Sequence, residues 1–243
     1  MTPLLDVDAI TKVFGGVRAV DGCSLQVAEG TVTALIGPNG SGKTTLFNII
    51  TGYLGADEGS VAFAGSDVTG KDPGRLYRTG LSRTFQQARV FPQLSVQENL
   101  VVAAGYGWRQ LFTRRVGRAD RERAGELLEE FRLAPVADLL AAELSYGQRK
   151  LLEFAAVLMS SPRLVLLDEP TAGVNPVMIE TMERHIRSRN AAGITFLVVE
   201  HDMTFVMRLC DPVIVLDAGK PIFSGAPAEV QRNPLVLDAY LGA

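Results

Sequence analysis

An eight-residue segment near the start of the chain has the residue types and spacing needed to bind phosphate. It fits the pattern GxxxxGK[ST] and lies between an apolar stretch, 32–36, and a helical pattern, 45–50. Glycines let the backbone turn so that N–H groups point at phosphate oxygens, and the positive end of the following helix favours the same anion. We expect these residues to bind ATP: Gly37, Pro38, Asn39, Gly40, Ser41, Gly42, Lys43, Thr44 and Thr45.

Within this segment, Lys43 and Thr44 have separate expected roles. The lysine would reach the β- and γ-phosphates, and the threonine hydroxyl would bind Mg²⁺. An ordinary glycine turn is the alternative interpretation. The flanking strand and helix patterns favour the phosphate-binding loop over that alternative.

Two adjacent carboxylates, Asp168 and Glu169, end a second apolar stretch, 164–167. Open parallel sheets bind ligands at the carboxyl ends of their strands. We therefore expect Asp168 to bind Mg²⁺, directly or through water, and Glu169 to act as general base on the attacking water. A surface turn after a buried strand is the alternative. Kinases, GTPases and recombinases share these two motifs, so they do not identify one enzyme class.

The segment 144–148, Leu-Ser-Tyr-Gly-Gln, predicts a further anion site. Ser145 is a suitable helix N-cap, and Gln148 three residues later completes a capping box. A helix that begins there would present its positive end to an anion. Taken alone, the pattern fits a capped helix with no ligand better.

The order of the motifs along the chain carries a family resemblance. Gln86 ends the sequence Arg-Thr-Phe-Gln, His201 follows the apolar stretch 194–199, and Phe14 precedes two glycines. In this order they resemble the Q-loop glutamine, the switch histidine and the adenine-stacking aromatic residue of ABC ATPases. The segment 144–148 resembles the LSGGQ signature of the same family. The match extends over nearly the whole chain.

The resemblance implies a head-to-tail pair of subunits, with ATP between the phosphate loop of one and the signature of the other. It implies that Phe14 stacks on adenine, that Gln86 binds Mg²⁺ or water, and that His201 orients the attacking water. The structural alternatives are a hairpin core residue for Phe14, a polar loop residue for Gln86 and a structural histidine for His201. The signature residues that would contact ATP across the pair are Ser145, Tyr146, Gly147 and Gln148.

Two departures from the family pattern indicate one subfamily. Tyr146 replaces the first glycine of the signature, and Asn175 stands where aspartate is common. Both are similar to the ATP-binding subunits of branched-chain amino-acid importers, as is the segment 232–242. That resemblance implies a second ATPase subunit, the same chain or a homologue, together with membrane permeases and, indirectly, a substrate-binding protein. It also implies a place on the cytoplasmic face of the cell membrane.

Three alternative functions stay open. An ATPase of a related urea or amide importer would share these features. An ABC ATPase acting on nucleic acid would usually carry two cassettes or a long coiled-coil insertion, and neither pattern occurs here. A different phosphate-loop enzyme, such as a small-molecule kinase, would leave Ser145, Gly147 and His201 without a role.

Hydrophobic periodicity predicts the elements that position these residues. Strands are expected at 7–10, 24–27, 32–36, 60–63, 164–167, 194–199 and 213–216. Helices are expected at 95–104, with a capping box of Ser95 and Glu98, at 121–131 and at 176–189. His185, within the last of these helices, is expected on the surface.

The fold class is α/β, with a RecA-like P-loop core, an antiparallel β subdomain and an inserted α-helical subdomain. We expect one ABC ATPase domain over 1–243. Its α/β core would comprise 1–86 and 160–243, and its helical subdomain, with the signature, 87–159.

Composition excludes other classes of protein. The 24 basic and 27 acidic side chains give a net charge of −3, which gives no reason to expect nucleic acid as a partner. Six arginines between Arg109 and Arg123 form a basic stretch; a solvated helix face is favoured, ahead of contact with lipid headgroups or a transporter loop. Two cysteines fit a reducing cytosol, and no run of ~18 apolar residues predicts a membrane span.

Overall fold

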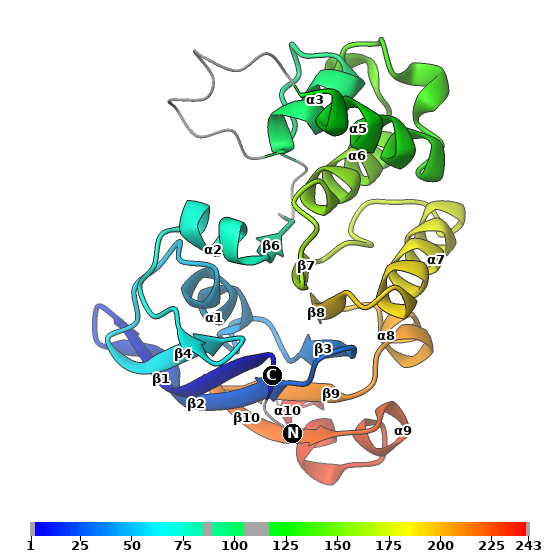
Figure 1. Ribbon diagram of the computed structural model, residues 1–243. Coiled ribbons are helices and arrows are strands. Elements are labelled where there is room, and N and C mark those ends of the chain that lie inside the picture. Colours follow the sequence, from blue (N-terminus) through cyan, green and yellow to red (C-terminus); the bar gives the residue numbers. More distant parts are fainter. Residues whose placement is uncertain (1–2, 85–88, 105–116, 242–243) are drawn as a thin grey trace.

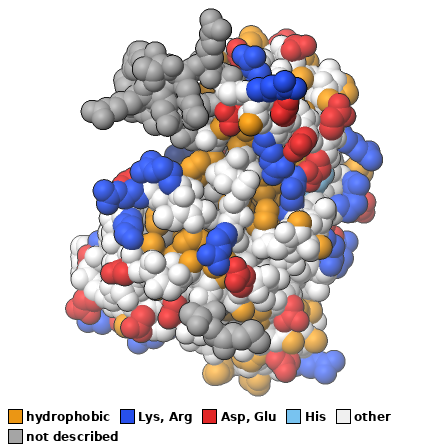
Figure 2. Space-filling model, in the orientation of Figure 1, with side chains coloured by type: hydrophobic (Ala, Val, Ile, Leu, Met, Phe, Trp, Pro, Cys, Tyr) orange, Lys and Arg blue, Asp and Glu red, His pale blue; other side chains and the backbone are white. Residues whose placement is uncertain are grey.

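The computed structural model describes residues 3–84, 89–104 and 117–241. It shows an α/β core with a helical lobe that projects from one side (Figure 1). In these three ranges, no helix has both the length and the apolar character required to cross a lipid bilayer. On the face seen in Figure 2, acidic and basic side chains are interspersed, and apolar side chains gather where the lobe meets the core.

The larger sheet of the core has the strand order β10-β9-β3-β8-β7-β6. Its strands run parallel except β10, which pairs antiparallel with β9. All residues of β3, β7 and β8 are buried, because helices cover both faces of a parallel sheet. The strands are β3 (Val32–Ile36), β6 (Leu81–Arg83), β7 (Leu164–Asp168), β8 (Thr195–Val199), β9 (Val213–Asp217) and β10 (Lys220–Gly225).

A smaller antiparallel sheet, in the order β2-β1-β4-β5, covers the other side of α1 (Lys43–Ile50). Leu46, Phe47 and Ile50 of that helix are buried in one cluster with residues of both sheets, including Leu5 and Leu166. The helix that follows the phosphate loop is therefore fixed between two layers. The strands are β1 (Leu5–Phe14), β2 (Val17–Val27), β4 (Glu58–Phe63) and β5 (Ser66–Asp67).

The helical lobe shares its hydrophobic core with the larger sheet. Phe154 of α6 packs edge-on against Phe131, with ring centroids 5.4 Å apart, and against Phe196 of β8 at 6.3 Å. The first helix of the lobe begins at a capping box in which Ser95 and Glu98 exchange hydrogen bonds, as predicted. The lobe comprises α3 (Val96–Ala103), α5 (Arg118–Glu130), α6 (Tyr146–Leu158) and two short 3₁₀ turns, Ala134–Val136 and Ala141–Glu143.

The other helices surround the core sheet. They are α2 (Pro73–Thr79), α7 (Pro176–Ala191), α8 (Met203–Leu209), α9 (Pro227–Val230) and α10 (Pro234–Leu241). Each predicted strand and helix is present, with its ends moved by a few residues at most sites. Strand β1 is longer than expected. Its pairing register with β2 and β4 shifts in the middle of the strand, so the alternation of apolar and polar residues does not continue into its second half. The sequence patterns missed β5, β6, β10, α2, α8 and the two C-terminal helices.

One expectation is wrong. His185 is not a surface residue: its side chain is 12% exposed and its ring stacks on Phe131, with centroids 4.1 Å apart. Burial lowers the pKa of this histidine, and the nearby carboxylate of Glu130 acts in the opposite direction. The error arose because the partner ring comes from Phe131, the C-cap of α5, which is far away in the sequence.

Both cysteines are buried free thiols. Burial raises the pKa of Cys23 to about 11 and that of Cys210 to about 12. Since the thiolate is the reactive form, we expect a disulfide reagent at about pH 8 to modify neither thiol in the folded protein. Denaturation should make both reactive, which Ellman's assay would count. Rapid labelling of the native protein would contradict the packing around β2 and α8.

Candidate functional site

The predicted phosphate loop connects β3 to α1 and is built on two glycines that no other residue could replace. A Cβ at Gly37 would lie 2.0 Å from the carbonyl oxygen of Leu216, and one at Gly42 would lie 2.3 Å from that of Ala19. Gly42 is also the N-cap of α1, with a φ of 101° in the left-handed region. The loop is thus held close to neighbouring backbone on both sides.

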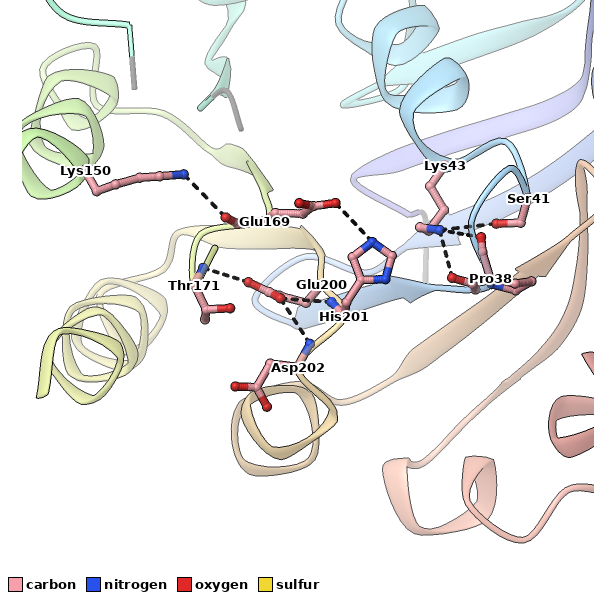
Figure 3. A network of polar contacts seen from close by, with 10 residues as sticks. Pro38, Ser41, Lys43, Lys150, Glu169, Thr171, Glu200, His201 and Asp202 are labelled. Carbon is pink, nitrogen blue, oxygen red and sulfur yellow. Dashed lines mark hydrogen bonds and ion pairs between the residues drawn. The ribbon is translucent and has the colours of Figure 1, made fainter. Parts of the chain in front are cut away.

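Lys43 curls back into this loop. Its Nζ donates to the carbonyl oxygens of Gly37 and Pro38, both at 2.8 Å, and lies 3.4 Å from Ser41 Oγ (Figure 3). The residue is only 6% exposed, and burial lowers its pKa, while the charge of Glu169 raises it. The loop therefore encloses a cation held by neutral carbonyls, which an anionic phosphate could replace.

A cavity of about 320 Å³ brings together eight of the predicted residues, from both the phosphate loop and the proposed catalytic pair. Residues of the phosphate loop form one side, and Glu169 and His201 form the other. Its lining consists of Ala19, Asn39, Gly40, Gly42, Lys43, Thr44, Thr45, Glu169 and His201. Pro38 and Ser41 line the adjoining cavity, which extends to α10.

Glu169 and His201 contact each other across this cavity. Glu169 Oε1 lies 3.0 Å from His201 Nε2, within hydrogen-bond distance. The backbone of Glu169 has a φ of 46°, in the left-handed region, which for a residue with a side chain costs about 1–3 kcal/mol. Such strain persists only where surrounding contacts hold it. Here it turns the carboxylate towards the histidine rather than along the direction of β7.

Glu200 connects the loops that carry these two side chains, and the sequence motifs did not identify it. Its buried carboxylate accepts three backbone N–H bonds, from Thr171 at 2.8 Å, His201 at 2.9 Å and Asp202 at 3.3 Å (Figure 3). Thr171 follows Glu169, so the loops after β7 and β8 are fixed relative to each other. An acidic residue at the end of the apolar β8 stretch was the available signal.

Asp168, the expected magnesium ligand, pairs with Arg83. Asp168 Oδ2 lies 2.7 Å from Arg83 Nη2, and both side chains are 7% exposed. Arg83 also donates to Asn48 Oδ1 at 2.6 Å and to Thr51 Oγ1 at 3.1 Å. The arginine therefore connects β6, the end of β7 and α1.

The donor set suits Mg²⁺. Asp168 and Thr44 would supply hard oxygen ligands, and the exposed Thr44 lines the cavity. Among the residues the structure describes, no three His, Cys, Asp or Glu side chains cluster as a metal site. Gln86, the third expected ligand, lies outside the described residues.

The segment 144–148 begins α6 as predicted. Ser145 Oγ accepts from the Gln148 N–H at 3.3 Å, and Gln148 Oε1 accepts from the Ser145 N–H at 2.9 Å. None of Ser145, Tyr146, Gly147 and Gln148 is among the described residues that line the cavity around Lys43. Within a single chain, the signature and the phosphate loop are therefore separate sites.

Phe14, the predicted adenine-stacking residue, is not among the described residues that line the cavity. It ends β1 and is 48% exposed, with Lys12 Nζ 5.7 Å from its ring centroid. Tyr240 of α10 lines a cavity together with Ile36, the residue before the phosphate loop. Burial raises the pKa of its phenol, and the backbone of Gly37 acts in the opposite direction. No sequence motif marked Tyr240, because this cavity joins segments far apart in the chain. Of the basic stretch 109–123, the part up to residue 116 lies outside the described residues.

Known proteins resemble this chain over its full length. Residues 20–172 match the family model of ABC transporters, and residues 220–243 match that of branched-chain amino acid ATP-binding cassette transporters. The high-affinity branched-chain amino acid transport ATP-binding protein BraF of Pseudomonas aeruginosa is 39% identical, covering 99% of this chain and 98% of its own.

Solved structures show the same fold. An ATP-binding cassette of an ABC transporter in its ADP conformation superposes with a TM-score of 0.89 at 37% identity, covering 100% of both chains. A dimeric ATP-binding cassette in a post-hydrolysis state, bound to ADP and phosphate, has a TM-score of 0.80 at 26% identity. It covers 92% of this chain and 98% of its own.

We expect Glu200→Gln to lower the free energy of unfolding by about 1–3 kcal/mol, because an amide NH₂ would then face backbone N–H donors. Urea denaturation would measure this change. Glu180→Gln, on the exposed side of α7, is the matched control and should leave stability nearly unchanged. Equal stability of the two variants would mean that Glu200 does not hold the loops together.

Proposed function

Because this chain belongs to the ABC transporter family, we propose that it is the ATP-hydrolysing subunit of an importer for branched-chain amino acids. The family expected from its motifs is confirmed, as is the α/β cassette fold. The names of the relatives and the match over residues 220–243 support this cargo rather than urea, an amide or a nucleic-acid substrate. One geometric observation carries the proposal: Lys43 and the Glu169–His201 pair face the same cavity.

In this function, the phosphate loop binds the triphosphate of ATP through its backbone N–H groups and Lys43. The lysine exchanges its carbonyl partners for phosphate oxygens. Phe14 stacks on adenine, which its exposed position at the end of β1 allows. Thr44, Asp168 and Gln86 would hold Mg²⁺, which would neutralise phosphate charge. Asp168 would do so beside its present partner, Arg83.

Hydrolysis uses the two side chains opposite the phosphate loop. Glu169 accepts a proton from water as its oxygen attacks the γ-phosphorus and the bond to ADP breaks. His201, whose Nε2 lies 3.0 Å from Glu169 Oε1, orients that water and the γ-phosphate. Glu200 keeps the two loops at this spacing, so the base and the histidine approach the water from fixed directions.

A second ATPase subunit completes the nucleotide site. Since Ser145, Tyr146, Gly147 and Gln148 do not line the cavity of their own chain, we assign them to the ATP bound by the partner. The dimeric solved cassette supports such a pair. The chain would act as one domain, with 87–159 as its helical subdomain and 1–86 with 160–243 as its core. It would bind permease subunits at the cytoplasmic face of the membrane, and through them respond to a substrate-binding protein.

We expect Glu169→Gln to bind ATP but to hydrolyse it at least about 100-fold more slowly, because the proton acceptor is lost while the binding groups stay. The variant should accumulate as an ATP-bound dimer, which light scattering with ATP and Mg²⁺ would detect. If it stays monomeric and hydrolyses ATP at the wild-type rate, Glu169 is not the base. Glu180→Gln is the control for the loss of one carboxylate.

Lys43→Ala should abolish ATP binding, since it removes the cation at the centre of the phosphate loop. Calorimetry with ATP and Mg²⁺ would measure this.

In cells of the source organism, the Lys43→Ala variant should fail to restore uptake of labelled leucine, isoleucine and valine after deletion of the gene. If uptake of all three is unaffected by the deletion, the proposed cargo is wrong. Undiminished ATP affinity would instead remove the role of Lys43.

A further inference from the structure

Lys150 is a buried lysine in α6 whose side chain reaches the loop of the proposed general base. The residue is 3% exposed, and its Nζ donates to the main-chain carbonyl of Glu169 at 3.4 Å. Figure 3 shows the side chain extending from the helical lobe to the start of that loop. A buried ammonium is unfavourable unless polar or charged partners surround it. The burial of Lys150 therefore requires polar or charged groups around its ammonium.

Carboxylates from the surrounding elements supply that environment. Burial lowers the pKa of Lys150, and four carboxylates act in the opposite direction by favouring its charged form: Glu153, Glu200, Asp168 and Glu169. Three of these four belong to the ends of β7 and β8, where the reaction is proposed to occur. The ammonium of Lys150 thus lies on the opposite side of this acidic group from Lys43, whose charge also interacts with Glu169.

The carbonyl that Lys150 contacts belongs to the strained residue. Glu169 has its φ in the left-handed region, and its carbonyl oxygen also accepts from the Ala172 N–H at 3.1 Å. The carbonyl group and the side chain of Glu169 both extend from the same Cα. Donors that fix the carbonyl therefore restrain the backbone from which the carboxylate extends, without touching the carboxylate.

Close packing joins the first turn of α6 to the same loop. The ring of Tyr146 lies against Gly173, where a Cβ would be 3.1 Å from its Cε1. Gly147 similarly faces Met178 of α7, at 3.0 Å from a Cβ. Lys150 Nζ lies 6.0 Å from the centroid of the Tyr146 ring, one helical turn away. Tyr146 and Lys150 thus contact the loop 169–175 together.

We propose that Lys150 is a positioning residue for ATP hydrolysis, which holds the carbonyl of Glu169 and so connects the signature helix to the base of the same subunit. The inference rests on the proposed function, since it assumes that Glu169 is the base. It adds a direct path between the two nucleotide sites of the pair. Ser145, which would touch the partner's ATP, begins the helix that carries Lys150, so a displacement of α6 reaches Glu169 through one side chain.

We expect Lys150→Met to lower kcat by about tenfold or more while the Kd for ATP changes by less than about twofold. Steady-state hydrolysis and calorimetry with ATP and Mg²⁺ would measure the two. Lys150→Arg, which keeps a cationic donor, should recover most of the rate. Lys71→Met is the matched control, because Lys71 also donates to a main-chain carbonyl, that of Asp67, but on an exposed turn. It should hydrolyse ATP at the wild-type rate.

A double-mutant cycle separates positioning from a general loss of structure. If Lys150 acts through Glu169, adding Lys150→Met to Glu169→Gln should cause little further loss in single-turnover hydrolysis. The proposal is overturned if Lys150→Met has the wild-type kcat, or if it loses ATP affinity as much as it loses rate. It is also overturned if Lys150→Met lowers the rate by the same factor in the Glu169→Gln background as in the wild type. Should Lys150→Met fail to fold by circular dichroism, Lys150→Leu, which also lacks a donor, takes its place with the same expectation. Wild-type protein that hydrolyses no ATP would contradict the proposed function instead.

Discussion

The buried carboxylate of Glu200 holds together the two loops on which the site depends. β7 and β8 are neighbours in the parallel sheet, so the loops after them start side by side, but the sheet does not fix where those loops go. Three N–H bonds from both loops do so, and they also offset the cost of burying a charge. The 3.0 Å contact between Glu169 and His201 follows from this arrangement.

Buried cations balance the acidic ends of the strands. Arg83 pairs with Asp168, Lys150 contacts the Glu169 carbonyl, and Lys43 is held by carbonyls of its own loop. Phosphate could replace the carbonyl partners of Lys43, and a metal ion could share Asp168 with Arg83. A triphosphate brings negative charge into this group, so its arrival must redistribute the cations rather than simply add contacts. We therefore expect the contacts of these cations to change when a charged ligand binds.

Sequence patterns predicted the features whose residues lie close together along the chain. The strand, glycine loop and helix around Lys43 are contiguous, and the capping boxes at Ser95 and Ser145 span four residues each. The contact of Arg83 with Asp168 and that of Lys150 with Glu169 join different elements, so the spacing of residues along the chain does not predict them. The stacking of His185 on Phe131 failed to be predicted for the same reason. Burial and partner identity are properties of the packed chain.

The tyrosine at position 146 changes how the signature relates to its own subunit. A glycine there would leave the surface of Gly173 uncovered, whereas the ring fills it and places an aromatic face near Lys150. The φ of 72° at Gly173 favours glycine, and a Cβ there would lie 3.1 Å from Tyr146 Cε1. Both the backbone conformation and the close ring therefore favour glycine at this position. The two residues are thus complementary, and a larger residue at 173 would require a smaller one at 146. Through this contact the helix that we propose to face the partner's nucleotide also packs against the loop of the proposed base.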